Sequence, residues 1–191
     1  MKKIQFSIVL SLLSICLCAQ TKFGVRAGVN LANASVSNYS PSISAGVNAG
    51  IFVQIPLVSI VSLRPELAYS TMGYKYTASI SGFSSTENTT SNYLVLPVLL
   101  RVKLPLIGLA VYAGPQYGVL LSAKATTSGV TQDVKSDYKS GDLAAVGGIE
   151  YSLPFGLFAT ARYQAGISNV SANPTFTQKN NAFTFLVGFK F

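Results

Sequence analysis

The sequence contains no histidine and no tryptophan, and its two cysteines, Cys16 and Cys18, lie close to the N-terminus. Histidine is the commonest general base and metal ligand in proteins, so its absence removes the usual starting point for both kinds of site. With no cysteine after residue 18, the rest of the chain has no disulfide to rely on. Only 10% of the residues are charged, whereas roughly 25% is typical of soluble domains. The sequence therefore offers little material for catalysis and little charge for a water-exposed surface.

Long apolar runs are also missing. Apart from the extreme N-terminus, no segment has the roughly 18 apolar residues that a membrane-spanning helix needs, although 49% of the residues are hydrophobic. This high hydrophobicity excludes an intrinsically disordered chain, and the length of 191 residues suits one domain. A membrane-like composition without a membrane helix points to a transmembrane β-barrel.

The basic residues do not form a nucleic-acid surface. The net charge is +8, from 14 basic and 6 acidic residues, and two of the basic ones are Lys2 and Lys3. The others are scattered along the chain, which is a poor electrostatic footprint for DNA or RNA. Gly24 and Gly28 are not followed by a helical pattern, so they do not form a nucleotide-binding element. We expect no nucleic-acid partner, no cofactor, no metal and no enzymatic activity.

The N-terminus has the pattern of a secretory signal peptide. Two lysines precede the apolar stretch 4–18, and Ala19 is a suitable small residue for cleavage. The alternative is a lipid anchor on Cys16 or Cys18, but neither cysteine follows the glycine or alanine that is usual in lipoprotein leaders. We expect two segments, a signal peptide at 1–19 and an outer-membrane barrel domain at 20–191.

Eight segments alternate apolar and small or polar residues with a period of two, as strands with one apolar face do. In the first of them the apolar side chains Phe23, Val25 and Val29 alternate with Gly24, Arg26 and others. Each segment is long enough for the roughly 9–11 tilted residues that cross a bilayer. The segments are 22–32, 43–54, 59–71, 92–104, 109–122, 142–153, 157–168 and 182–191.

The connections alternate between short turns and long polar loops, which is the pattern of an outer-membrane barrel. The short ones are 55–58, 105–108 and 154–156, and the long ones are 33–42, 72–91, 123–141 and 169–181. We therefore predict an all-β fold, an eight-stranded antiparallel up-and-down barrel in the bacterial outer membrane. The short turns and both termini are expected on the periplasmic side.

A soluble lipocalin-like barrel is the alternative, since its strands also alternate. In such a barrel the outward positions carry many charges, whereas here the non-apolar positions are mostly Gly, Ser, Asn and Thr. We therefore expect the apolar positions to face lipid and the others to face a narrow lumen. Outward positions near the middle of the bilayer are Val47, Leu67, Leu96 and Phe185. At the lumen position Asn48 an arginine is expected to be tolerated better than at these four.

Six charged residues fall on the inward positions of five strand segments, at depths between the periplasmic rim and the barrel middle. Lone charges at such depths would be strongly desolvated, so an ionic network is expected, in which each glutamate contacts at least one arginine. Tyr93, Tyr112 and Gln116 are expected to fill the volume nearby. Independent charges solvated by lumen water are the alternative, and the surplus of cations is consistent with an anion site. The predicted network consists of Arg26, Arg64, Glu66, Arg101, Glu150 and Arg162.

The C-terminal segment alternates aromatic residues and ends on one. Such a strand resembles the C-terminal signal that the barrel-assembly machinery recognises, so this machinery is an expected partner together with outer-membrane lipid. The alternative is that the strand only faces lipid. The predicted signal residues are Phe183, Phe185, Phe189 and Phe191.

The order and spacing of several short patches resemble the PorT-type outer-membrane β-barrel family. The patches are KFGVRAGVNL at 22–31, RPELAYS at 64–70, YLVLPVLL at 93–100, AGPQYG at 113–118 and the pair Arg162-Tyr163. The resemblance spans the whole chain after the leader and implies a compact exported eight-stranded barrel. Some members of that family support type IX secretion, and most have no assigned activity. Val95 departs from the polar residue that relatives often carry, so no site is transferred to that position.

Two functional hypotheses follow. The leading one is a non-enzymatic structural or accessory envelope protein whose long extracellular loops bind other envelope or secretion proteins. The alternative is a narrow channel for ions or very small solutes. Eight strands leave an interior only just wide enough for side chains, which favours a closed lumen. An outer-membrane acyl hydrolase or transferase is disfavoured, because the chain has no histidine to act as the base.

Overall fold

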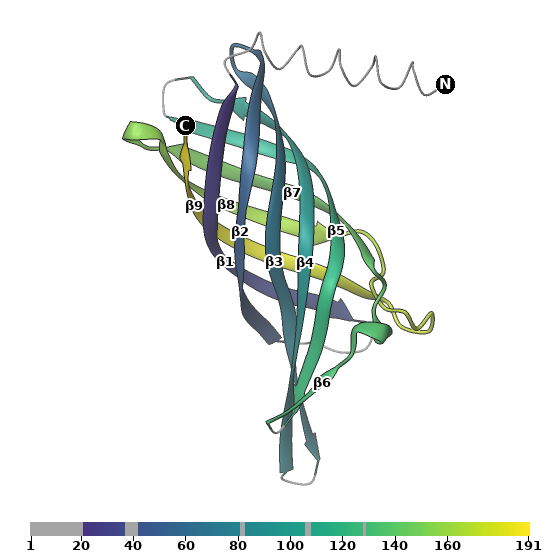
Figure 1. Cartoon of the computed structure of the whole chain (residues 1–191). Coiled ribbons are helices and arrows are strands. Elements are labelled where there is room, and N and C mark those ends of the chain that lie inside the picture. The colour runs from purple at the N-terminus through teal and green to yellow at the C-terminus, as the bar shows by residue number, and fades with distance from the viewer. Residues whose placement is uncertain (1–20, 37–41, 81–82, 106–107, 128) are drawn as a thin grey trace, which may run out of the picture.

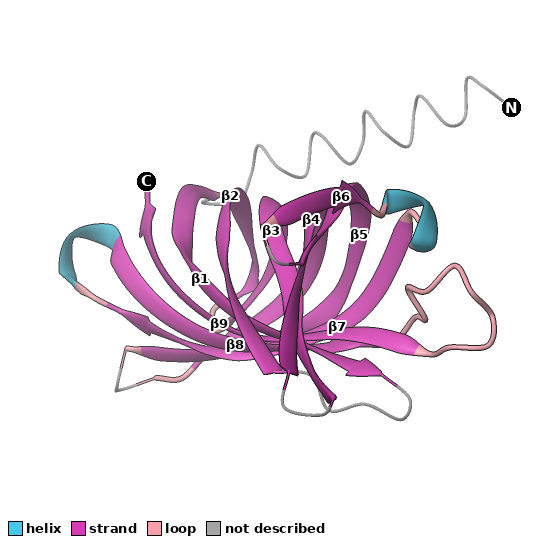
Figure 2. Cartoon of the chain, turned by 90° about the horizontal axis from the view of Figure 1, so that it is seen from below, coloured by secondary structure: helices cyan, strands magenta, loops and turns pink. Residues whose placement is uncertain are grey.

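Strands make up nearly all of the structure, a computed structural model that describes residues 21–36, 42–80, 83–105, 108–127 and 129–191. The predicted signal peptide, with Cys16 and Cys18, lies outside the described residues. Figure 2 shows that the two short 3-10 helices sit in connections between strands. The described elements are β1 (Lys22–Val36), β2 (Ser42–Val58), β3 (Val61–Ile80), β4 (Phe83–Lys103), β5 (Leu109–Thr127), β6 (Val130–Asp133), η1 (Lys135–Asp137), β7 (Gly141–Ser152), η2 (Pro154–Gly156), β8 (Leu157–Gly166) and β9 (Gln178–Lys190).

Eight of the strands close into a barrel. Each pairs antiparallel with its neighbours in the order β4-β3-β2-β1-β9-β8-β7-β5, and the pairing of β4 with β5 completes the ring. The strand β6 pairs with β5 alone and lies outside the ring. The predicted eight-stranded antiparallel barrel is therefore confirmed (Figure 1). No helix in the described part of the chain is long and apolar enough to span a membrane.

The strands continue beyond the ends that the alternation predicted. Most of the predicted loop 72–91 is a β-hairpin, since β3 and β4 stay paired from Val61–Val102 to Ile80–Phe83. This hairpin projects beyond the barrel at the end opposite the termini (Figure 1). It is rich in Ser, Thr and Tyr. Thr and Tyr favour strands, but a segment with these residues does not show the apolar alternation used to predict the strands. The predicted loop was therefore wrong over most of its length.

Other boundaries also differ from the prediction, for example at β1, which runs to Val36, and at β9, which begins at Gln178. The predicted turn 55–58 is part of β2, and the chain turns at residues 59–60 instead. A register irregularity next to Pro56 accommodates a residue that cannot donate a hydrogen bond to the ladder. In the predicted loop 123–141, β5 extends to Thr127 and folds back on β6. Backbone pairing persists at these places although the apolar alternation has ended.

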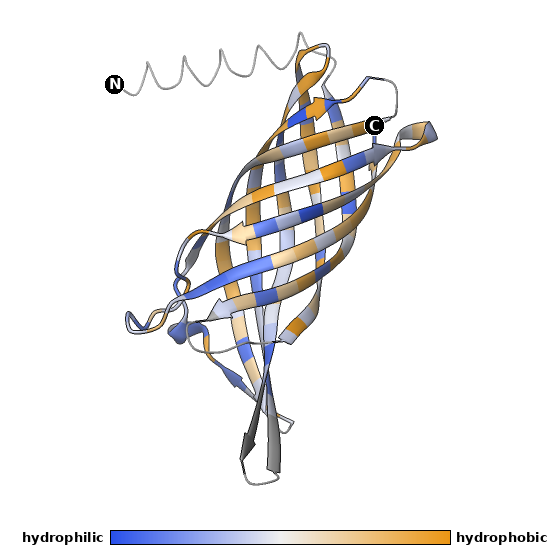
Figure 3. Cartoon of the chain, turned by 180° about the vertical axis from the view of Figure 1, so that it is seen from behind, coloured by the Kyte–Doolittle hydropathy of each residue, from blue (hydrophilic) through white to orange (hydrophobic). Residues whose placement is uncertain are grey.

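Hydrophobic and hydrophilic residues alternate along the barrel strands (Figure 3), and their exposure places the apolar side chains mostly outside and the polar or small ones mostly inside. Val47, Leu67, Leu96 and Phe185 are all exposed on the outside, and Val47 has 55% of its surface accessible. Asn48, next to Val47 in the chain, is only 6% exposed and lies in the lumen. The predicted assignment of faces is confirmed at these positions.

The glycine at position 28 lets two strands approach closely at the seam between β1 and β9. A Cβ atom at Gly28 would overlap the backbone carbonyl of Phe185. Because backbone atoms cannot rotate away as a flexible side chain can, any other residue would push β9 outward. Glycine in a strand commonly marks such a close backbone approach.

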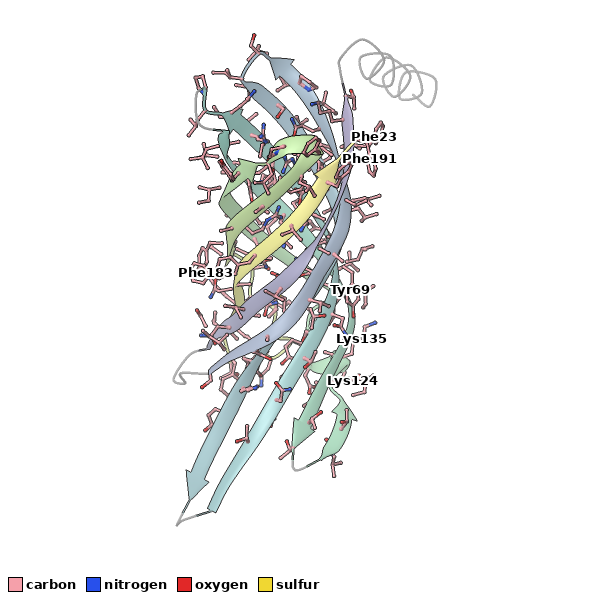
Figure 4. The ribbon with its side chains drawn as sticks, turned by 90° about the vertical axis from the view of Figure 1, so that its left-hand side faces the viewer. Phe23, Tyr69, Lys124, Lys135, Phe183 and Phe191 are labelled. Carbon is pink, nitrogen blue, oxygen red and sulfur yellow. The ribbon has the colours of Figure 1, made fainter. Side chains whose placement is uncertain are left out.

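The two ends of the barrel differ. Phe23 and Phe191 lie together at one end, where the Phe191 N–H donates to the Phe23 carbonyl oxygen at 2.8 Å (Figure 4). Lys124 and Lys135 lie toward the opposite end, near the projecting hairpin (Figure 4). We call these the terminal end and the hairpin end.

An arginine at Val47 is expected to destabilise the folded barrel in lipid vesicles by about 2–4 kcal/mol, because the side chain would sit among acyl chains near the bilayer middle. The matched substitution Leu57→Arg, also outward but at the end of β2, should cost only about 0–1 kcal/mol. Urea unfolding in vesicles measures both values. Equal costs at the two depths would contradict the assigned lipid face.

The tolerance expected for an arginine at Asn48 stays a prediction, and the contacts of Asn48 set a cost for it. Asn48 accepts a hydrogen bond from Arg26 at 2.7 Å and donates one to Ser70 at 3.2 Å. An arginine there would bring a second cation beside Arg26 and overfill a packed interior. The lumen around Asn48 is filled by these specific contacts.

Candidate functional site

Glu150 is the centre of one ionic cluster inside the barrel, near the terminal end. Its Oε1 accepts hydrogen bonds from Nη2 of Arg101 at 2.8 Å and from Nζ of Lys190 at 2.6 Å. Its Oε2 forms an ion pair with Nη1 of Arg64 at 2.6 Å. The glutamate is 0% exposed. One carboxylate from β7 therefore joins cations from β3, β4 and β9, and we call these four residues the Glu150 cluster.

The guanidinium of Arg64 is the most enclosed of these cations. It is 0% exposed, and its Cζ lies 4.7 Å from the ring centre of Phe52 and 5.7 Å from that of Phe158. The two rings also contact each other edge to face, with their centres 5.6 Å apart. Aromatic faces attract cations, and more so away from water. The aromatic pair thus covers the guanidinium of Arg64, whose Nη2 also donates to Oε1 of Gln54 at 2.9 Å.

Glu66 is the centre of a second cluster. Its Oε2 lies 2.8 Å from Nη2 of Arg26 and 3.0 Å from Nη1 of Arg162. Arg162 is bidentate, because its Nη2 also donates to Oε1 of Glu66 at 3.3 Å. We call these three residues the Glu66 cluster. It joins β1, β3 and β8 across the lumen.

Tyr112 lies between the two clusters. Its ring centre is 5.2 Å from Cζ of Arg162 and 5.9 Å from Cζ of Arg64. Its hydroxyl accepts a hydrogen bond from Nε of Arg162 at 3.3 Å and contacts the hydroxyl of Thr160. The aromatic ring therefore separates the positive charges while it contacts one member of each cluster.

A layer of neutral polar side chains follows the Glu66 cluster toward the hairpin end. Asn30 donates to Oγ of Ser70 at 2.9 Å and accepts from Thr184 at 2.8 Å. Gln116 on β5 donates to Gln164 on β8 at 2.8 Å. Buried polar groups need such partners, since each unpaired one costs free energy. Together these neutral side chains fill the middle of the barrel and place no charge there.

An apolar layer closes the lumen at the hairpin end. Tyr93, Val95, Leu120 and Met72 pack together there with several alanines, and Tyr138 from the connection after η1 packs against them. The loops that carry this cap are joined, because Lys139 N–H donates to the Val170 carbonyl oxygen at 2.8 Å. The predicted loops 123–141 and 169–181 therefore contain an ordered lid over the barrel.

A depression of about 410 Å³ lies in this lid at the hairpin end. The rings of Tyr74, Tyr138 and Phe176 and the carboxylates of Glu87 and Asp137 are among its walls. The two tyrosine hydroxyls are 3.3 Å apart. Burial raises the pKa of Tyr138 above its ordinary value, so this phenol stays protonated and available as a donor.

The structure brings all six predicted charged residues together in the two clusters. Of the three neighbours expected, Tyr112 contacts the network, whereas Gln116 pairs with Gln164 in the polar layer. Tyr93 lies in the apolar layer and accepts from Asn180, so its expected place beside the charges was wrong. The sequence interpretation missed Lys190 and Phe52. Lys190 falls on an inward position of the predicted segment 182–191, and this position indicated that its side chain would face the lumen.

The four C-terminal phenylalanines are on the outward side of β9 or directly after it. Phe183 and Phe185 are exposed, and the ring of Phe183 lies 4.7 Å from that of Tyr163. The rings of Phe189 and Phe191 lie 5.1 Å apart at the terminal end. This arrangement suits a lipid-facing strand and leaves the aromatic side chains accessible from outside the barrel.

The site has no donor set for a metal ion among the described residues. No group of three or more Asp, Glu, His or Cys side chains occurs in that part of the chain. Both central carboxylates are instead used by arginines and a lysine. The surplus is positive, with five cations against two carboxylates in the two clusters.

Comparisons with solved structures show the same fold in small outer-membrane proteins. Neisserial surface protein A aligns with a TM-score of 0.59 at 18% identity, over 88% of this chain and 97% of its own. Ail, the attachment invasion locus protein of Yersinia pestis, solved with the heparin analogue sucrose octasulfate, aligns with a TM-score of 0.55 at 12% identity, over 90% of this chain and 99% of its own. At these identities the likeness concerns the fold alone.

Sequence comparison identifies the family. No curated protein sequence matches the chain. A family model described as outer membrane protein beta-barrel domain matches residues 18–172, which is most of the chain. The closed barrel, its apolar outward face and its charged interior agree with that match. The chain therefore belongs to the outer membrane protein beta-barrel domain family and is a protein of the bacterial outer membrane.

Proposed function

We propose that this protein is a non-conducting, non-enzymatic barrel that acts as a structural or accessory component of the outer membrane. The observation that carries the proposal is the filled lumen. The Glu150 and Glu66 clusters contain side chains from β1, β3, β4, β7, β8 and β9, six of the eight barrel strands. In this proposal the ion pairs across the lumen occupy the space that a water path would need and fix the barrel's cross-section.

The hairpin end is the proposed binding surface. It carries the projecting β3–β4 hairpin, the short β5–β6 hairpin and the depression between Tyr74 and Phe176. The terminal end, in contrast, has short connections such as η2. In outer-membrane barrels the long connections are extracellular and the short turns periplasmic. We accordingly assign the hairpin end to the cell exterior and both termini to the periplasm.

The finer assignments rest on the sequence. The leader 1–19 supports export by a cleaved signal peptide. The outward phenylalanines Phe183, Phe185, Phe189 and Phe191 support recognition by the barrel-assembly machinery. The resemblance to the PorT-type family supports a role as an accessory to protein secretion, with an envelope or secretion protein as the partner of the hairpin end.

Conductance in planar lipid bilayers tests the closed lumen. The purified barrel is expected to give no stable conductance steps, because the interior of an eight-stranded barrel is filled by side chains. A large porin inserted under the same conditions serves as the positive control. Steady unitary conductance of the native protein would overturn the proposal in favour of the narrow channel.

Site-specific cross-linking tests the binding surface. After signal cleavage the chain has no cysteine, so Lys135→Cys at the hairpin end and Phe155→Cys at the terminal end would each introduce the only thiol. Both positions are exposed, Phe155 at 91%. Cross-linking in native membranes should capture one defined partner through Lys135→Cys and not through Phe155→Cys. The same capture from both ends would contradict the assignment of the surface.

A further inference from the structure

A basic cavity of about 500 Å³ opens at the terminal end of the barrel. Its lining includes Lys22 from β1, Arg101 and Lys103 from β4, and Lys190 from β9. All four lie on the inward positions of their strands, and they line one space from the neighbouring strands β1 and β9 and from β4. This convergence is separate from the hairpin end and from the function proposed for it.

The positive charge in this cavity is only partly neutralised. Arg101 and Lys190 share the carboxylate of Glu150, which Arg64 also contacts. Among the described residues, no carboxylate forms an ion pair with Lys22 or Lys103. Glu150 is 0% exposed behind the cations, so an incoming anion would meet ammonium and guanidinium groups first.

The rest of the cavity combines hydrogen-bond donors with an apolar edge. Ser152 lines it beside Lys190, and the distance from its Oγ to Nζ of that lysine is 3.5 Å. Leu157 and Phe191 form part of the rim, and both are exposed to the outside of the barrel. The cavity thus joins the lumen to the level at which a membrane-spanning barrel meets lipid headgroups.

We propose that this cavity binds a phosphate-bearing anion. Arginine and lysine are the usual partners of phosphate oxygens, and basic pockets at membrane surfaces bind anionic headgroups. Lys22 and Lys103 supply the unneutralised charge, Arg101 and Lys190 the deeper contacts, and Ser152 a hydroxyl donor. Two sources provide this chemistry, the headgroup of an anionic phospholipid in the adjacent leaflet and free phosphate in the surrounding solution.

The test compares the native chain with two charge-matched variants. Lys22→Gln/Lys103→Gln removes the two unpaired cations of the cavity, and Lys124→Gln/Lys135→Gln removes two exposed cations near the hairpin end. Neither pair belongs to the ionic clusters, and a heat-dependent gel shift verifies that each variant folds. In one arm, barrels are extracted from mixed phosphatidylcholine and phosphatidylglycerol vesicles, and native mass spectrometry counts the retained phosphatidylglycerol. In the other, inorganic phosphate is titrated by calorimetry against barrels in pure phosphatidylcholine nanodiscs.

The cavity variant is expected to bind about 25-fold more weakly, from about fivefold for each lysine removed at a membrane surface. The hairpin-end variant should bind like the native chain. Loss confined to the phosphatidylglycerol arm identifies a lipid headgroup, and loss in the phosphate arm identifies free phosphate as a ligand. Absence of binding by the native chain in both arms, or equal binding by both variants, would overturn the proposal.

Discussion

Glu150→Gln is expected to lower the free energy of unfolding by about 3–5 kcal/mol, the usual cost of removing one partner from a buried ion pair. The substitution keeps the size of the side chain and its hydrogen-bonding oxygen but removes the charge. Arg64, Arg101 and Lys190 would then repel one another inside the barrel with no carboxylate between them. Urea unfolding in lipid vesicles, followed by the gel shift between folded and boiled forms, measures the loss.

A second substitution separates this charge effect from general damage to the lumen. In the Glu150→Gln background, Lys190→Met removes one of the three cations. In the native chain the Nζ of Lys190 lies 4.8 Å from the ring centre of Phe158, and the methionine side chain can keep an apolar contact with that ring. The double variant should therefore be more stable than Glu150→Gln alone, with a coupling of about 0.5–3 kcal/mol. Additive losses would show that the three cations do not depend on Glu150 for neutralisation.

The alternation of side chains predicted the barrel well where the strands cross the lipid. Apolar residues such as Val47 and Leu96 must alternate with inward ones there, because only one face of each strand contacts acyl chains. Outside the lipid this requirement ends, so the pattern is lost while backbone pairing continues. For that reason β3 and β4 extend to Ile80 and Phe83 through a segment that looked like a polar loop.

The members of the ionic network were also accessible from the sequence, but their partners were not. Arg162 and Glu66 lie 96 residues apart in the chain, and they meet because of how the ring closes and how far each strand is staggered against the next. No local pattern in the sequence predicts the stagger between neighbouring strands. Phe52, an apolar residue on an inward position of β2, fills the lumen against Arg64. Phe52 and Phe158 show that a large apolar side chain on an inward position can be the partner of a buried cation.

The two clusters hold the barrel in different ways. The Glu150 cluster lies at the terminal end, where Lys190 and Arg101 also line a cavity. The Glu66 cluster is enclosed between Tyr112 and the neutral layer around Asn30 and Asn48. With less access to water, a charge left unpaired beside Glu66 has no route to solvation except local opening of the barrel. Loss of the Glu66 carboxylate should therefore favour local opening of the barrel as well as lower its free energy of unfolding.

Glu66→Gln is accordingly expected to cost about 3–5 kcal/mol of unfolding free energy, because it leaves Arg26 and Arg162 buried without a carboxylate. Glu66→Ala should cost at least as much, since it adds a cavity. The matched control is Glu87→Gln in β4 near the hairpin end, where the carboxylate accepts one hydrogen bond from Thr89 at 3.3 Å. Its cost should stay within about 0.5 kcal/mol. Urea unfolding of all three variants in vesicles measures these costs. If Glu66→Gln lowers the free energy of unfolding no more than Glu87→Gln does, the central ion pairs do not stabilise the barrel.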